Sequence, residues 1–214
     1  MITLTALLEI PNQATIDINY RVLNDLSIKL KDRADNELPS YGIISTTGSV
    51  SFKDYKGVIK GHAERQLLQG SVVKINMSNT LTGDVEQIGE FYVADWDYDN
   101  ASQMVRIELQ DNLVEMQEIN HIGIDLARDD RGLIISTKTA EDLYNELYNA
   151  TPQKYRFLPF GSLDSATKAR LQQTKFKYFY LESASLWRQW TKLCELVQGH
   201  IHKNSLAETI FKVD

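Results

Sequence analysis

The residues with the clearest potential for chemistry are three aspartates at alternate positions, Asp95, Asp97 and Asp99. Alternating acids also open the calcium loop of EF-hand proteins, in which a glycine stands sixth and a glutamate twelfth. In this chain the sixth position is Asn100 and the twelfth is Arg106, so the spacing fails. Because alternate side chains of a strand share one face, we predict an outward polar edge here and no metal site.

The four histidines supply no complete ligand set and no catalytic pair. His200 and His202 lie two residues apart on a predicted strand, which points both rings to the same side, as in some zinc sites. No third ligand stands near them in the sequence, so a solvated or interface strand is favoured. His62 has the spacing of a packed helix face and His121 falls in a predicted loop. Neither has a nucleophile or an orienting acid as a partner.

Packing explains the one cysteine and two of the tryptophans better than chemistry does. Cys194 lies on a predicted helix with an apolar stripe, whereas a reactive thiol needs exposure and nearby positive charge. Trp187 and Trp190 lie three apart on that helix, where core packing is favoured over sugar stacking. Asp164 and Glu182 could be named as the two carboxylates of a glycosidase, but nothing in the sequence distinguishes them from the other acids among the 29 of the chain. We therefore predict no catalytic residues, no cofactor-binding residues and no metal ligands.

The composition limits the class of protein. The 214 residues are 43% hydrophobic and 24% charged, as in ordinary globular chains of one or two domains. The net charge of -6 disfavours a general nucleic-acid-binding surface, because phosphate binding needs clustered lysines and arginines. A single cysteine excludes an internal disulfide. No apolar run approaches the roughly 20 residues of a membrane span, and the start lacks a secretory signal, so we expect a soluble protein folded in a reducing compartment.

The first half of the chain has the two-residue period of strands with one buried face. Residues 2–10 form a further, more evenly apolar strand candidate, and residues 57–68 interrupt the strands as a short helix that ends near Gly70. About seven strands before residue 112 favour a sandwich or a small barrel. The alternating apolar rows are Ile16, Ile18, Tyr20 and Val22; Leu26, Ile28 and Leu30; Val73, Ile75 and Met77; Tyr92, Ala94, Trp96 and Tyr98; and Val105, Ile107 and Leu109.

The second half is predicted to be mixed. Helices are predicted at about 139–150 and 185–198, the first opened by a capping box from Thr139 and Asp142 and the second ended by Gly199. Further predicted elements are a short helix at 162–172, a strand at 176–181, and a hairpin of 200–203 with 209–213, whose last strand leaves its outer edge unpaired.

These patterns predict a β-rich α+β fold with two domains. Residues 1–125 would form an antiparallel β-barrel-like or sandwich domain with one short helix. Residues 126–214 would form a smaller α+β domain that ends in the helix and the hairpin.

Four short motifs of the first half occur in the order known from one protein family. They read G-x-x-x-F-x-D-x-x-G at residues 48–57, G-x-x-V-x-I at 70–75, G-x-F-x-V-x-x-W at 89–96 and V-x-I-x-x-x-D-x-L at 105–113. They resemble the N-terminal barrel of the baseplate hub and tail-associated proteins that cap the tail tube of tailed bacteriophages. Residues 185–197 and 200–203 resemble the helix-then-hairpin unit of the same family, so the similarity spans most of residues 43–213.

The resemblance implies a structural virion protein, a tail hub or baseplate hub component that is made in the bacterial cytoplasm and resides in the virion tail. It would form a ring, a trimer or a hexamer, with copies of itself and contact other phage tail proteins. DNA would pass through without specific binding, and no membrane or cofactor is implied. Hub proteins commonly continue through a further barrel, so we expect a shortened hub or the first part of a longer one.

Two other functions remain open at this point. A carbohydrate-binding module for attachment to the host surface would use Trp96, Tyr98, Trp187 and Trp190 as stacking residues, which requires exposed ring faces. A wall hydrolase is disfavoured, because no nucleophile, base or metal set reaches the required arrangement and no lysin or peptidase motif is present. We therefore expect no enzymatic activity.

Overall fold

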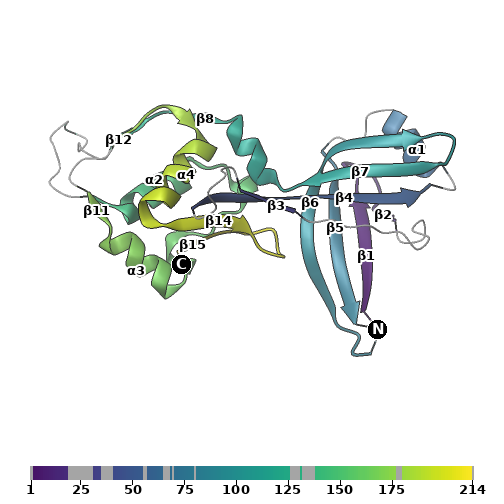
Figure 1. Ribbon diagram of the computed structural model, residues 1–214, viewed down its shortest axis with the longest axis horizontal. Helices are drawn as coiled ribbons and strands as arrows, with labels where there is room; N and C mark the ends of the chain where they lie inside the picture. The colour runs from purple at the N-terminus through teal and green to yellow at the C-terminus, as the bar shows by residue number, and fades with distance from the viewer. Residues whose placement is uncertain are drawn as a thin grey trace. The chain divides into compact units, whose positions relative to one another are not determined.

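The computed structural model describes residues 2–18, 31–34, 41–54, 57–64, 68, 70–79, 81–125, 131, 138–176 and 180–213. The chain divides into two compact units, and its segments alternate between them (Figure 1). Unit 1 comprises Met1–Arg33, Thr46–Asn112 and Ser205–Ala207, and unit 2 comprises Ala34–Ser45, Leu113–Asn204 and Glu208–Asp214. The predicted boundary after residue 125 adjoins residues 126–130, which lie outside the described part, and it stays a prediction.

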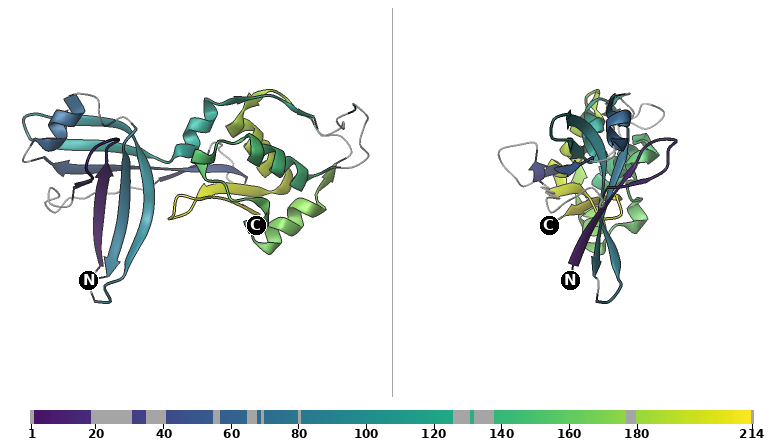
Figure 2. Two further views of the ribbon diagram at one scale, coloured as in Figure 1. Left: turned by 180° about the vertical axis from the view of Figure 1, so that it is seen from behind. Right: turned by 90° about the vertical axis from the view of Figure 1, so that its right-hand side faces the viewer.

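Antiparallel strands build unit 1. Its sheet runs in the order β4, β7, β6, β5, β1 and β2, with β3 paired to β4. Figure 2, left, shows β1 in purple beside β5 and the longer β6. The elements are β1 (Ile2–Glu9), β2 (Ile16–Asp17), β3 (Lys31–Ala34), β4 (Gly42–Lys53), α1 (Val58–Glu64), β5 (Val72–Asn79), β6 (Val85–Asp99) and β7 (Met104–Gln110).

The α+β, strand-rich fold class is confirmed, with an open sheet in place of a closed barrel. Closure would require the last strand of the path to pair with the first. Among the described residues, β2 has only two residues and pairs with β1 alone, through Leu7↔Asp17 and Leu8↔Ile16. The predicted rows from Asn19 to Leu30 lie outside the described residues.

A β-bulge in β6 reverses which side chains face the core. Val93 pairs with Leu109 but Asp95 pairs with Glu108, so Ala94 is an extra residue without a cross-strand counterpart. Phe91 and Val93 are buried before the bulge, and Trp96 and Tyr98 pack on the same core after it. The predicted apolar row of Tyr92 and Ala94 is therefore wrong, because a one-residue insertion shifts a two-residue period by one face.

A buried carboxylate starts helix α1. Asp54 has no solvent exposure, and its side-chain oxygens accept hydrogen bonds from the backbone N–H groups of Val58 (3.1 Å), Ile59 (2.8 Å) and Lys60 (2.9 Å). These N–H groups have no partner within the helix, so the carboxylate satisfies them and its charge suits the helix N-terminus. Gly57 joins the two segments with φ at +63°, a backbone angle that favours glycine.

A second buried aspartate ties β7 to β4. Asp111 is 2% exposed, and its carboxylate accepts a hydrogen bond from the backbone N–H of Thr46 at 2.5 Å. Its own N–H donates to the carbonyl of Thr46 at 3.0 Å. The aspartates at fixed places in two of the four sequence motifs therefore serve the fold of unit 1.

Unit 2 packs helices and short strands around one apolar cluster. Thr139 caps α2 in a full capping box with Asp142, as predicted, and Ser185 caps α4. The elements are η2 (Asn112–Gln117), β8 (Asn120–His121), β9 (Ile124–Asp125), β10 (Lys138–Thr139), α2 (Ala140–Ala150), η3 (Gln153–Tyr155), η4 (Phe160–Ser162), α3 (Ser165–Gln173), β11 (Lys175–Phe176), β12 (Tyr180–Leu181), β13 (Ala184–Ser185), α4 (Leu186–Val197), β14 (Gly199–Lys203) and β15 (Thr209–Val213), where η marks a 3-10 helix.

The core of unit 2 centres on Trp190. The indole is fully buried, its ring lies 5.3 Å from Tyr144 edge to face, and it stacks on Phe157 at 4.4 Å. Its N–H donates to Thr151 Oγ1 at 2.9 Å, so the one polar group of the indole is satisfied inside the apolar interior. The predicted stripe along α4 is confirmed, because Leu186, Trp190, Leu193 and Val197 all have no exposure.

The end of α4 differs from the prediction by one residue. The left-handed cap is Gln198, with φ at 60° and ψ at 46°, and Gly199 already belongs to β14. A Cβ atom on Gly199 would lie 2.7 Å from the carbonyl oxygen of Lys212. Glycine is therefore required at position 199 because β15 approaches closely, and not because α4 ends there.

The prediction that residues 209–213 leave their outer edge unpaired is wrong at both ends. Thr209 N–H donates to the carbonyl of Arg156 at 2.9 Å, and its carbonyl accepts from Leu158 N–H at 3.2 Å. The N–H of Val213 donates to Thr167 Oγ1 at 3.2 Å. On its other side β15 pairs with β14, which in turn lies parallel to the start of β4 through His200↔Gly42.

Replacing Asp54 with alanine should destabilise the protein by about 3 kcal/mol, because three helix N–H groups would lose their buried acceptor. Urea unfolding followed by circular dichroism measures this change. The matched control is Asp97→Ala, at an exposed aspartate of β6, which should stay within about 0.5 kcal/mol of the wild type. Equal stability of Asp54→Ala and the wild type would contradict this account of α1.

Candidate functional site

The three alternate aspartates lie on the exposed face of β6. Asp95, Asp97 and Asp99 are all exposed, as the strand pattern predicts. The Asp95 carboxylate accepts from the backbone N–H of Trp96 at 2.8 Å. Asp99 accepts from Ser102 Oγ at 2.5 Å and closes the β6–β7 turn, and these hydrogen bonds lower the pKa of its carboxyl group. Within the described part of the chain no three histidine, cysteine or acidic side chains lie together as a metal-binding group.

Two of the four histidines lie together in the structure. The rings of His200 and His202 stack on β14 with centroids 5.2 Å apart. His121 lies on β8, where its Nδ1 contacts Gln189 Oε1 at 3.0 Å. His62 belongs to α1, and its side chain is outside the described residues.

Cys194 and both tryptophans of α4 are buried. Cys194 and Trp190 have no exposure and Trp187 has 7%. Burial raises the pKa of the Cys194 thiol, so the thiolate that a nucleophile requires is suppressed. Trp96 and Tyr98 are half-buried against the core of unit 1, and Lys60 Nζ lies 5.9 Å from the Tyr98 ring centroid. The buried rings of α4 cannot stack on a sugar.

Asp164 serves as the N-cap of α3. Its carboxylate accepts from Thr167 N–H at 2.9 Å and from Thr167 Oγ1 at 2.7 Å. These hydrogen bonds hold the pKa of the Asp164 carboxyl below its usual value, whereas the general acid of a glycosidase needs a raised pKa. Glu182 lies elsewhere in unit 2, on the wall of a pocket.

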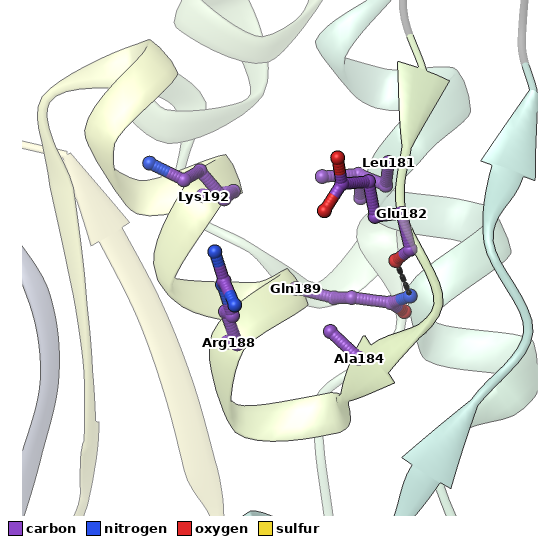
Figure 3. Close-up of a pocket in the computed structure, with 6 residues that line it drawn as sticks. All are labelled: Leu181, Glu182, Ala184, Arg188, Gln189 and Lys192. Atoms are coloured by element: carbon purple, nitrogen blue, oxygen red, sulfur yellow. Dashed lines mark hydrogen bonds between the residues drawn. The ribbon is translucent and has the colours of Figure 1, made fainter.

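That pocket brings charged and apolar groups together around an open space. Its volume is about 280 Å³. Helix α4 supplies one wall and the segment from β12 to β13 supplies the other, as Figure 3 shows. The lining residues are Leu181, Glu182, Ala184, Arg188, Gln189 and Lys192. The sequence analysis did not single out this arrangement, although Arg188 and Lys192, four residues apart on one helix face, were a signal for it.

Gln189 holds the two walls together. This side chain is 1% exposed, and its Nε2 donates to the backbone carbonyls of Glu182 (3.1 Å) and Ile122 (3.3 Å). Because Nε2 is committed to carbonyls, Oε1 is the acceptor and His121 Nδ1–H is the donor. The floor of the pocket is therefore fixed by a fully bonded amide.

The charges of the pocket are only partly compensated. Lys192 Nζ pairs with Glu195 at 2.6 Å, outside the set of lining residues. Arg188 and Glu182 form no ion pair with any residue that the structure describes. Figure 3 shows the Glu182 carboxylate directed toward α4, with the Arg188 guanidinium on the facing wall. An unpaired guanidinium beside apolar Leu181 and Ala184 is suited to binding a carboxylate that carries an apolar neighbour.

Comparison with known proteins identifies the fold. No protein family and no curated protein matches the sequence. Solved structures do match, among them two that align over nearly the whole chain. The tail protein from Neisseria meningitidis MC58 is 11% identical, with a TM-score of 0.51, over 97% of this chain and 50% of its own. The 43 kDa tail protein of prophage MuSo2 from Shewanella oneidensis is 10% identical, with a TM-score of 0.51, over 99% of this chain and 56% of its own.

The chain therefore has the fold of tail proteins, one of them from a prophage, and it spans about half the length of each. At this level of identity the match concerns the fold. Separately, none of the described helices combines the length and the apolar character that crossing a membrane requires.

Stability should fall in acid partly through Asp164. Its folded-state pKa is depressed, so its contribution is present above the unfolded pKa and is lost as the pH falls through the folded value, below about pH 4. Asp164→Asn retains a capping side chain without the charge. Between pH 6 and pH 2.5 the variant should lose roughly 0.5 kcal/mol less than the wild type in urea unfolding. Identical losses would show that the charge contributes nothing.

The thiol of Cys194 should be unreactive in the native protein, because it is fully buried and its pKa is raised. A chromogenic disulfide reagent should label less than about a tenth of the native protein in an hour and label the unfolded protein within minutes. Rapid stoichiometric labelling without denaturant would contradict the packing of α4.

Proposed function

We propose that this protein is a structural component of a bacteriophage tail. In this proposal it is a hub that forms a ring of three or six copies at the tail end, contacts other tail proteins and lets DNA pass. The observation that carries the proposal is the fold match to two tail proteins over 97% and 99% of the chain. The protein would be made in the bacterial cytoplasm and would act in the virion.

The roles of the motif residues support a structural function. Asp54 and Asp111 are buried and their carboxylates are hydrogen-bonded to backbone N–H groups, so both side chains stabilise the fold. Gly89 of the third motif is buried where a Cβ atom would lie 2.5 Å from the Phe91 ring. The motif residues at these three positions therefore have structural roles. We therefore propose that the protein is not an enzyme.

The surface charge agrees with DNA passage. The chain carries 29 acidic against 23 basic residues, and Asp95, Asp97 and Asp99 form an exposed acidic row on β6. Such a row repels phosphates, which suits a passage through which DNA slides without being held. The carbohydrate-binding alternative gains no comparable support, because Trp187 and Trp190 are buried.

The purified full chain should assemble into closed rings. Native mass spectrometry at tens of micromolar protein should give a species of three or six times the mass of one chain, and negative-stain images should show rings with a central opening. A closed ring requires head-to-tail contacts, which leave no free end. A monomer at every concentration, which also fails to associate with tails from phage particles, would overturn the proposed function.

A further inference from the structure

Residues 81–86, from the turn between β5 and β6 and the first two residues of β6, present apolar and acidic side chains to solvent. Leu81 is 85% exposed and Val85 is 69% exposed. Asp84 and Glu86 are exposed beside them, and the turn contains no basic residue. We call these residues the tip. Large apolar side chains on a protruding turn are more common at contact sites than on free surfaces.

The backbone of the tip is held in one conformation. Gly83 N–H donates to the carbonyl of Asn79 at 2.8 Å, and Asn79 N–H donates to the carbonyl of Asp84 at 2.9 Å. The Asn79 side chain accepts from Leu81 N–H at 3.0 Å. Gly83 has φ at +77°, which glycine adopts without strain. A turn fixed in this way loses little conformational entropy when it binds.

The pocket of unit 2 has complementary properties. Arg188 is a cation without an ion-pair partner among the described residues, and Leu181 and Ala184 offer an apolar surface beside it. Its volume of about 280 Å³ lies below the roughly 300–1,000 Å³ typical of small-molecule sites, which favours a few side chains as the occupant. Glu182 on the facing wall disfavours a ligand that places more than one negative charge inside the pocket, so only one acid of the tip can enter.

We propose that the tip of one copy binds in the pocket of the next copy, with the Asp84 carboxylate on the Arg188 guanidinium and an apolar tip residue against Leu181 and Ala184. The inference rests on the proposed ring and names the contact that closes it. The occupant is a second copy because each chain carries one tip and one pocket, the pairing that a head-to-tail ring requires. The edge of β15 is less suited to this contact, since Thr209 and Val213 at its two ends are already bonded within the chain.

Charge reversal in the full chain tests the contact. Asp84→Lys and Arg188→Glu should each weaken self-association at least about tenfold, and the chain carrying both should recover most of the loss, because the ion pair is re-formed with reversed signs. Matched controls are Glu118→Lys and Lys175→Glu, at exposed positions outside the tip and the pocket. Sedimentation equilibrium gives the association constants, and circular dichroism checks that each variant is folded.

Mixing the two single variants gives a second readout. The Asp84→Lys chain keeps its pocket and the Arg188→Glu chain keeps its tip, and the reversed tip of the first chain also matches the reversed pocket of the second. The two chains should therefore alternate in the mixture, and native mass spectrometry should show species with equal numbers of both, whereas each variant alone should be mainly monomeric.

The outcomes separate the two proposals. Rings that persist in both single variants would overturn the tip contact and leave the ring intact. The same conclusion would follow if the doubly changed chain stayed as weak as the single variants. A wild-type protein that is monomeric up to about millimolar concentration, well above the range of specific protein contacts, would overturn the tip contact, and one that also failed to associate with phage tails would overturn both proposals.

Discussion

Burial of Trp190 is the interaction on which unit 2 depends. Its ring contacts Tyr144 and Phe157, and its N–H is satisfied by Thr151, so helix α2, helix α4 and the segment after α2 share one core. Loss of such a ring typically costs 3–5 kcal/mol, roughly half the stability of a small domain. The wall of the pocket is the outer face of the same helix. The pocket wall is therefore held rigid by the packing of Trp190 in the core.

Sequence reasoning succeeded where a local signal and the final structure agree. The capping box of Thr139 and the stripe along α4 each depend on spacing within one helix, and both are present. It failed where the local structure depends on contacts with residues far away in the sequence. The bulge at Ala94 is set by pairing with β7, and the need for glycine at position 199 comes from the carbonyl of Lys212. No pattern in residues 92–98 alone contains that pairing.

The pocket could not be predicted from the sequence, because it too depends on contacts between separate segments. Its two walls are close in the chain, but they become a site only because the amide of Gln189 bonds the carbonyls of Glu182 and Ile122. From sequence alone Gln189 is one polar residue on an amphipathic helix. Its 1% exposure, and not its type, shows that it organises the site. Buried, fully bonded amides fix geometry because any rearrangement leaves them unsatisfied.

The alternation of the chain between units has a consequence for biosynthesis. Strand β4 begins in unit 2 and continues in unit 1, and its first residues pair in parallel with β14, some 160 residues later in the chain. Neither unit can be excised as one contiguous piece. On the ribosome, the first residues of β4 lack their β14 partner until the β14–β15 hairpin has emerged. The nascent chain should be most prone to aggregation before that point, when chaperones would bind it.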